Sequence, residues 1–485
     1  MRRLLYLFPI FLYCSLGWAQ TPTLVQHVTC PNSGNTSGGA GNLYKCPLPE
    51  LTQSGNALVM GIISNSSSGT STVTDDKSNK WTLAGHAVDS SENTIEVWFA
   101  LNIAAGTHMI SVTPPSTGNY VTIAASEYYN VATTSALDTE NCHTGTANTT
   151  SITAGSITPS VSGDLLWQVA FNANATGSSS FTVGSQTGIT WQLLGTSLND
   201  GDASQGGAYA STSAINPTFT AGTTNLWDSC VMALKAATAG NAPTSSFRIV
   251  HMLHEQLKST ATSPASIQFP ASGNLVAVSF IGGGTTISSI ASTPSNTWSS
   301  SGTAATTSDT SSQIYYCPGC STSNSMTMSV AWSTASGSTF MIYDITGAAA
   351  SSPLDVDSGG QTGSQGSMGP STTCTSCLTP TVANDLVLGN LAQTDCTSTA
   401  VTAPSGGLFD AATYTLNPID GPEDVDQNNG WMHFYDSGTS ALTVTWTEAC
   451  GTNNLNAWAG RLAAFKAAQS NNQLMPPTGL KAVPQ

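Results

Sequence analysis

Short runs in which apolar and polar residues alternate recur along most of the chain. Residues 95–99, 120–124 and 165–171 are examples. Clusters of Gly, Pro, Asn and Ser separate successive runs every ~8–15 residues, as turns separate short strands. A period of two is the pattern of strands, and no stretch shows a sustained helical period with helix caps. The pattern predicts an all-β protein.

The same order of segments occurs twice. The Ser-Gly-Asn turn at residues 54–56 recurs at 272–274, and the closing segment that ends in Lys-Ala-Ala at residue 237 recurs at residue 468. A repeat of this length is a whole domain, because solenoid and propeller repeats are only ~20–50 residues long. We predict two tandem antiparallel β-sandwich domains of jelly-roll type, at residues 20–237 and 248–468, joined by a linker at residues 238–247. We call them module 1 and module 2.

The two ends of the chain are predicted to lie outside these modules. Residues 1–19 have the pattern of a secretion signal, with Arg2 and Arg3 before an apolar stretch and a small-x-small cleavage site at residues 17–19. No apolar run approaches the ~18 residues of a membrane span. We expect an exported chain that begins near Gln20, with residues 469–485 as a flexible tail.

Charged residues are few and mostly acidic. They make up 8% of the chain, and the net charge of −16 would become −18 on loss of Arg2 and Arg3 with the signal. Binding to nucleic acid or to anionic lipid depends on Lys and Arg, so this balance argues against both partners.

The cysteines predict disulfides. Ten of the 11 cysteines follow the signal, and an even number in an exported chain is typical of disulfide bonding. Their spacing suggests the pairs Cys30–Cys46, Cys317–Cys320, Cys374–Cys377 and Cys396–Cys450, which leaves Cys142–Cys230. Two alternatives remain open for the Cys-x-x-Cys pairs: a four-cysteine zinc site, and a redox motif at residues 317–320, although that motif follows a strand and does not begin a helix.

The motifs together resemble a module of exported bacterial surface and extracellular proteins, where it often stands beside fibronectin type III or other immunoglobulin-like domains. The resemblance rests on the Ser-Gly-Asn turn, on Asn-x-Trp at residues 79–81 and 296–298, and on residues 99–107. Module 2 departs from it at residues 316–320. The resemblance implies an extracellular β-sandwich without a defined activity. Residues 476–483 are similar to the opening strand of a fibronectin type III domain.

An acidic loop occupies the same place in both modules. It contains Asp200 and Asp202 in module 1, and Asp424, Asp426 and Asn428 in module 2. Carboxylate and amide oxygens at such spacing are the ligands that calcium prefers. These loops are therefore candidate calcium sites, with a solvated acidic turn as the alternative; the spacing of later residues does not fit an EF-hand.

Aromatic residues near these loops are candidate ligand-binding groups. Trp191, Trp431 and Tyr435 could stack on sugar rings if exposed, and a place in the core is the alternative. No catalytic residue is assigned. We expect a secreted, non-catalytic binding, adhesion or structural protein that recognises extracellular polysaccharide. The competing hypothesis is a polysaccharide-active enzyme, a glycoside hydrolase or lyase, that uses paired carboxylates.

Overall fold

The computed structural model describes most of the chain between Gln20 and Ala468. The described residues are 20–33, 43–65, 69–89, 93–115, 120–172, 180–197, 201–257, 263–308, 310–333, 338–365, 371–393, 396–402, 430–436, 438–450 and 456–468. These ranges contain 33 strands and no α-helix, which confirms the all-β prediction. They therefore contain no helix that is long and apolar enough to cross a membrane. The predicted signal and tail lie outside them.

The strands form four successive units. Unit 1 contains β1 (Thr23–Ser33), β2 (Tyr44–Pro47), β3 (Ala57–Asn65), β4 (Thr72–Asp75), β5 (Trp81–Val88), β6 (Asn93–Ala100), β7 (Met109–Thr113) and β8 (Tyr120–Tyr129). Unit 2 contains β9 (Leu137–Thr144), β10 (Thr149–Thr153), β11 (Asp164–Asn172), β12 (Phe181–Thr182), β13 (Gln192–Thr196), β14 (Asp202–Tyr209), β15 (Thr218–Asn225) and β16 (Trp227–Leu234).

Units 3 and 4 follow the predicted linker. Unit 3 contains β17 (Arg248–Leu257), β18 (Ala265–Gln268), β19 (Leu275–Gly282), β20 (Ile287–Thr293), β21 (Ser299–Ser300), β22 (Ala305–Thr306), β23 (Ser311–Pro318), β24 (Thr327–Trp332) and β25 (Ser338–Thr346). Unit 4 contains β26 (Leu354–Asp357), β27 (Gln361–Gln365), β28 (Ser371–Leu378), β29 (Asp385–Gln393), β30 (Cys396–Thr402), β31 (Gly430–Asp436), β32 (Leu442–Cys450) and β33 (Asn456–Phe465).

Each unit is a jelly roll. In unit 1 the larger sheet has the order β1-β8-β3-β6-β5 and the smaller one β2-β7-β4; unit 2 repeats this as β9-β16-β11-β14-β13 and β10-β15-β12. The first strand of a unit thus pairs with the eighth, the second with the seventh and the third with the sixth, which is a long hairpin folded over itself. Units 3 and 4 have the same order in their described strands. Each predicted module therefore consists of two jelly rolls, a subdivision that the sequence analysis missed.

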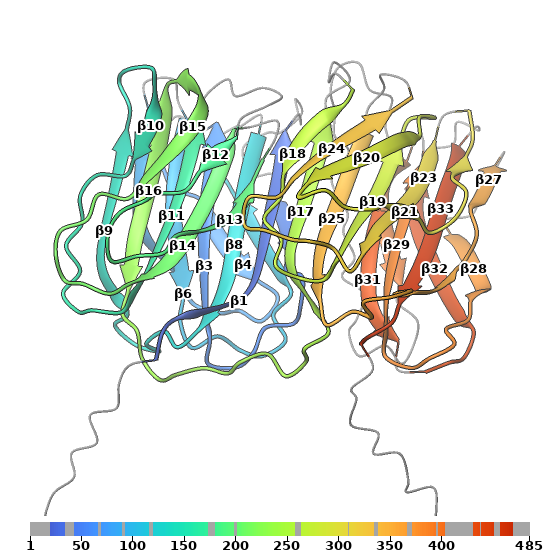
Figure 1. The fold of residues 1–485 in the computed structure, drawn as a ribbon, viewed down its shortest axis with the longest axis horizontal. Coiled ribbons are helices and arrows are strands. Elements are labelled where there is room, and N and C mark those ends of the chain that lie inside the picture. The colour runs from blue at the N-terminus through green and yellow to red at the C-terminus, as the bar shows by residue number, and fades with distance from the viewer. Residues whose placement is uncertain are drawn as a thin grey trace, which may run out of the picture.

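The two modules share one sheet. Strands β1 and β17 pair in parallel, with His27 opposite His251, and join the larger sheets of units 1 and 3 into eleven strands (Figure 1). Because this pair is parallel, β1 and β17 end at the same end of the molecule. The described chain ends, Gln20 and Ala468, lie at the opposite end (Figure 1).

Both faces of the shared sheet are covered. The face that carries the small sheet of unit 1 carries unit 4 in module 2, and the face that carries unit 2 carries the small sheet of unit 3. In β3, Leu58, Met60 and Ile62 face the small sheet of unit 1, whereas Val59 and Ile63 face unit 2. In β19 the order is reversed: Leu275 and Ala277 face unit 4, whereas Val276 and Val278 face the small sheet of unit 3. The two modules are thus related by an approximate two-fold rotation about an axis along the strands. Units 2 and 4 lie on opposite faces of the shared sheet.

Three of the predicted disulfides are present. They are Cys30–Cys46, Cys142–Cys230 and Cys317–Cys320. The Cys-x-x-Cys pair at residues 317–320 is thus a disulfide at the end of β23, and in this structure it is neither a reduced redox pair nor a pair of zinc ligands. The backbone of β30 places Cys396 opposite Cys450 in β32. The side chains of the predicted pairs Cys374–Cys377 and Cys396–Cys450 lie outside the described part of the structure.

Replacing both Cys142 and Cys230 with alanine should lower the free energy of unfolding by about 2–4 kcal/mol. This bond joins residues 88 apart, whereas Cys30–Cys46 joins residues 16 apart. Because the longer loop restricts the unfolded chain more, the first double substitution should cost about 1.5 kcal/mol more than the same change at Cys30 and Cys46. Urea unfolding of both variants checks this, and an equal or reversed order would contradict it.

Candidate functional site

Two aspartates of unit 2 form a pair: Asp164 begins the third strand, β11, and Asp138 lies in the first strand, β9. Asp164 is fully buried, and its carboxyl group lies near that of Asp138 of β9. Asp138 also accepts hydrogen bonds from the backbone and hydroxyl of Ser160, and Lys235 Nζ lies 3.4 Å from its Oδ1. The four residues tie together the first, third and eighth strands of the unit.

Unit 4 contains the same group. Asp385 is fully buried against Asp355, which accepts hydrogen bonds from Thr381 and lies 3.7 Å from Lys466 Nζ. Thr381 and Lys466 also line an open hollow of about 700 Å³. The sequence repeat contains all four positions, but only Thr381 and Asp385 are close along the chain, so no local motif indicated that they meet Asp355 and Lys466.

The two members of each pair differ in proton affinity. Burial, together with the adjacent Asp138, raises the pKa of Asp164 to about 7. Burial and the adjacent Asp355 raise the pKa of Asp385 to about 8. Burial alone would also raise the pKa of Asp138, but the hydrogen bonds from Ser160 and the nearby Lys235 hold it below its ordinary value. The raised pKa values therefore keep a proton on Asp164 and Asp385 over part of the neutral range, while the lowered pKa values keep Asp138 and Asp355 ionised.

Asparagine occupies the equivalent positions in units 1 and 3. Asn56 Nδ2 donates to Glu127 Oε1 at 2.6 Å, and Asn274 Nδ2 donates to the backbone oxygen of Ala348 at 2.7 Å. A protonated Asp164 or Asp385 can donate a hydrogen bond as these amides do. The pairs thus fasten strands. Glycoside hydrolases need two carboxyl groups that reach the substrate, whereas Asp164 and Asp385 are fully buried.

A second polar network joins unit 4 to unit 1. Tyr435 Oη donates to Glu50 Oε1 at 2.6 Å, and the Ile249 amide donates to the same oxygen at 2.7 Å. Burial raises the pKa of Glu50 to about 7, against the opposing effects of these hydrogen bonds and of Arg248. His433 Nε2 lies 2.8 Å from the Pro49 oxygen. These contacts hold the two modules together on one face of the shared sheet.

Buried histidines lie along the junction of β1 and β17. His251 Nδ1 is 2.8 Å from Asp344 Oδ2, and both side chains are almost fully buried. His27 contacts the hydroxyls of Ser126 and Thr29 at 2.8 and 3.0 Å. Burial, with His251 nearby, lowers the pKa of His27 well below its ordinary value. His27 is therefore neutral at physiological pH.

A cleft of about 400 Å³ opens on the other face, where units 1, 2 and 3 meet. The starts of β1 and β17 line it together with the end of β14 and the start of β13. Arg248 stands in its wall and donates through Nη1 to the backbone oxygen of Val25. Polar side chains, the apolar side chains of Pro22, Leu24 and Val250, and bare backbone form the rest of the lining.

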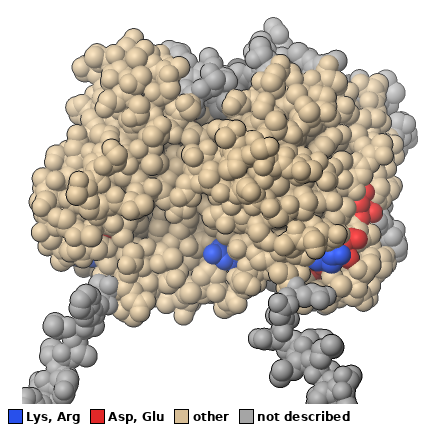
Figure 2. Space-filling view, viewed as in Figure 1, with Lys and Arg blue, Asp and Glu red and all other residues tan. Residues whose placement is uncertain are grey.

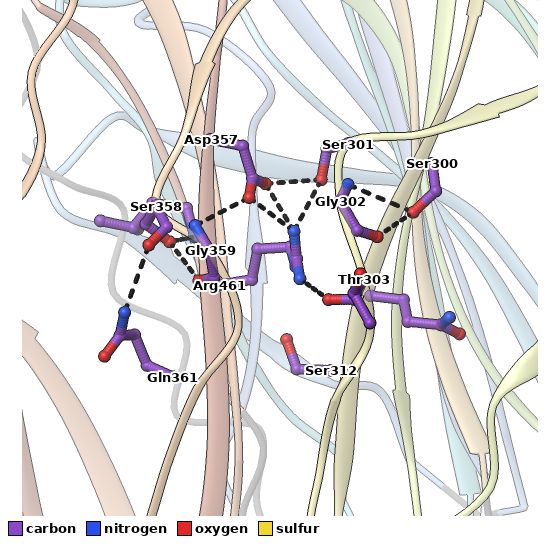
Figure 3. A network of polar contacts seen from close by, with 12 residues as sticks. Ser300, Ser301, Gly302, Thr303, Ser312, Asp357, Ser358, Gly359, Gln361 and Arg461 are labelled. Carbon is purple, nitrogen blue, oxygen red and sulfur yellow. Dashed lines mark hydrogen bonds and ion pairs between the residues drawn. The ribbon is translucent and has the colours of Figure 1, made fainter.

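An ion pair within unit 4 takes the place of the disulfide within unit 2. Arg461 of β33 and Cys230 of β16 occupy equivalent positions, because their partners Asn390 and Val169 are equivalent in β29 and β11. Arg461 Nη1 lies 2.7 Å from both carboxylate oxygens of Asp357 and 3.4 Å from Ser301 Oγ, and Nη2 donates to the oxygen of Thr303 (Figure 3). The buried guanidinium thus fastens unit 4 to the loop after β21.

The structure places all three candidate aromatic residues in the interior. Trp431 is 0% exposed, Trp191 is 5% exposed and donates to Gln186, and Tyr435 is 6% exposed and bonds to Glu50. In this conformation their faces are not available to a sugar ring. Among the described residues, the exposed large hydrophobic side chains are Leu43 and Val161, and neither is aromatic.

One of the candidate calcium ligands lies within the described residues. Asp202 begins β14 and is 2% exposed, opposite Phe171 of β11. Asp200, Asp424, Asp426 and Asn428 lie outside the described ranges. Within those ranges no three His, Cys, Asp or Glu side chains gather in a way that could hold a metal ion. Calcium binding by the loops stays a prediction.

The surface in Figure 2 is almost uncharged. Basic and acidic side chains are confined to its lower part and to one side, as expected from the 8% of charged residues. Comparison with known proteins adds no assignment, because no protein-family model, curated protein or solved structure matches this chain.

Proposed function

We propose that the protein is exported and acts outside the cell as a non-catalytic binding or structural protein, with an extracellular polysaccharide as its ligand. The observation that carries this proposal is the shared eleven-stranded sheet. It holds two modules in one rigid body, with β1 and β17 ending at the same end. Loops of both modules at that end would keep a fixed spacing, and two sites at a fixed spacing on one polymer raise avidity.

Two further observations support binding over catalysis. The disulfides are typical of proteins outside the cytoplasm, and the Ser- and Thr-rich, charge-poor surface offers hydroxyl groups to a neutral polymer. The carboxyl pairs would be the natural catalytic groups of the competing enzyme hypothesis. Asp164 and Asp385 are fully buried, and their partners Asp138 and Asp355 accept hydrogen bonds from Ser160 and Thr381, so the pairs favour a structural role.

Retention on insoluble polysaccharides tests the proposal. The mature protein should be retained by at least one neutral polymer in the presence of calcium, and the polymer should release no soluble sugar. If the acidic loops hold calcium, a chelator should reduce retention, and so should the double substitution Asp424→Ala and Asp426→Ala.

The surface variant Asp76→Ala serves as the control for loss of a carboxylate and should bind like the wild type. If no polymer retains the protein, with or without calcium, only a structural role remains. Release of sugar during incubation would instead establish the enzyme.

A further inference from the structure

The two faces of the molecule differ at one equivalent position. Leu165 pairs with Ala208 in unit 2, and the equivalent Leu386 pairs with Tyr435 in unit 4. Two residues earlier along β14 and β31, Gly206 corresponds to His433, because their partners Trp167 and Leu388 are equivalent. The large polar side chains of Tyr435 and His433 in unit 4 thus correspond to the methyl group of Ala208 and to a glycine in unit 2.

This difference explains why a cleft exists on one face. In module 2, Tyr435 and His433 fill the space against unit 1, where they bond to Glu50 and Pro49. In module 1, Ala208 and Gly206 occupy the corresponding positions, where unit 2 faces unit 3. Their small size leaves a space of about 400 Å³ open between them and β17. The volume falls within the ~300–1,000 Å³ of small-molecule sites.

The glycines at the cleft cannot be replaced without rearrangement. A Cβ on Gly206 would lie 2.6 Å from Tyr128 Oη, and one on Gly207 would lie 2.7 Å from the backbone oxygen of Thr190. Gly206 therefore lets unit 2 approach Tyr128 of unit 1, Gly207 lets β14 pack on residues 189–190 of its own unit, and the two give the cleft a wall of backbone. Such close approach of bare backbone is a common use of glycine at binding sites.

The chemistry of the lining suits a sugar. Its polar side chains are the hydroxyls of five Ser and Thr residues and of Tyr128, together with the amide of Gln192 and the guanidinium of Arg248. Hydroxyl and amide groups both donate and accept hydrogen bonds, as sugar hydroxyls do. The nearby carboxyl groups of Glu50, Glu127 and Asp344 interact with Arg248 and offset its charge. With the net charge of −16, this favours an uncharged ligand over an acidic one.

We propose that the cleft between units 1, 2 and 3 binds one uncharged sugar unit of a glycan, with Arg248 and Gln192 donating hydrogen bonds to its hydroxyls. This inference rests on the proposed polysaccharide ligand and adds a second place of contact, at the starts of β1 and β17, opposite the end at which these two strands finish. It also assigns the site to the junction of the two modules, so neither module alone contains it.

The variant Ala208→Tyr tests the cleft by introducing the residue that unit 4 has at the same position. Binding of soluble neutral hexose oligosaccharides, measured by calorimetry on the full mature chain, should weaken at least about tenfold. Gln192→Ala, which removes an amide and adds no bulk, should weaken binding several-fold. Ala291→Tyr adds the same ring at an exposed position of β20 and should bind like the wild type. Thermal unfolding of each variant checks that it is folded.

The possible outcomes separate this inference from the proposed function. Equal binding by wild type and Ala208→Tyr, with retention on polymers intact, would overturn the cleft and leave the proposed function standing. No binding of any neutral oligosaccharide by the wild type would also overturn the cleft, whatever the polymers show. Tighter binding of oligogalacturonate than of neutral oligosaccharides would overturn the assignment to an uncharged sugar.

Discussion

Replacing Arg461 with methionine should lower the free energy of unfolding by about 3–5 kcal/mol. The guanidinium is fully buried and bonds to both oxygens of Asp357, whose side chain is only 13% exposed. Methionine fills much of the same volume but leaves the carboxylate without its counter-charge and Thr303 without its donor. An uncompensated charge in the interior is among the most destabilising changes that a single substitution can make.

A double substitution distinguishes loss of the pair from loss of packing. In Arg461→Met with Asp357→Leu no charge remains, so much of the lost stability should return. Urea unfolding of the wild type, both single variants and the double variant gives the coupling energy directly. If the double variant loses as much stability as the two single variants together, Arg461 and Asp357 are not coupled and the ion pair does not hold β26 to β33.

Replacing Asp164 and Asp385 with asparagine should flatten the dependence of stability on pH. Both carboxyl groups have a folded-state pKa, about 7 and about 8, above the ordinary value of 3.8. The stability that each contributes is complete below its unfolded pKa and is lost as the pH rises towards the folded pKa. Each group steepens the curve by up to about 1.4 kcal/mol per pH unit within that range.

Asparagine removes the titration and keeps a donor, as Asn56 and Asn274 do in units 1 and 3. The double variant should therefore exceed the wild type in stability at pH 8, and the difference should shrink as the pH falls towards 4. Comparing variant with wild type at each pH cancels the contributions of Asp228, Glu50 and the buried histidines, which also titrate with shifted pKa values. If stability depends on pH in the same way in the variant and the wild type, neither Asp164 nor Asp385 has a raised pKa. The groups that face the two carboxyls are Asp138 and Lys235 in unit 2, and Asp355, Asp436 and Lys466 in unit 4.

The sequence predicted the strands and the long repeat, but not the repeat within each module. The four third strands begin after related turns: Ser-Gly-Asn at 54–56, Ser-Gly-Asp at 162–164, Ser-Gly-Asn at 272–274 and Ala-Asn-Asp at 383–385. Gly55, Gly163 and Asn384 all have positive φ values in these turns. Asparagine tolerates this conformation better than most residues, so the last turn keeps its shape without glycine. Three residues, none of which the last turn shares with Ser-Gly-Asn, are too short a signal to establish a repeat.

The candidate aromatic residues show why the alternation of apolar and polar residues could not tell exposed side chains from buried ones. Trp431 and Tyr435 project from β31 towards units 1 and 3, whereas Met432 and Phe434 project towards the small sheet of unit 4. Since both faces of this sheet are covered, both sets of side chains are buried. The carboxyl pairs were missed for a different reason, because Asp164 and Asp138 meet only when the jelly roll brings the first and third strands to the eighth.

The parallel pairing of β1 with β17 also bears on why the modules occur in tandem. In a single module the first strand would be the outer strand of its sheet, with a row of unpaired backbone groups that tends to join another chain. Here the equivalent strand of the second module occupies that place, at the register of His27 and His251. Duplication within one chain therefore has the effect of a permanent homodimer: each copy covers the open edge of the other, at a local concentration that no dilution lowers.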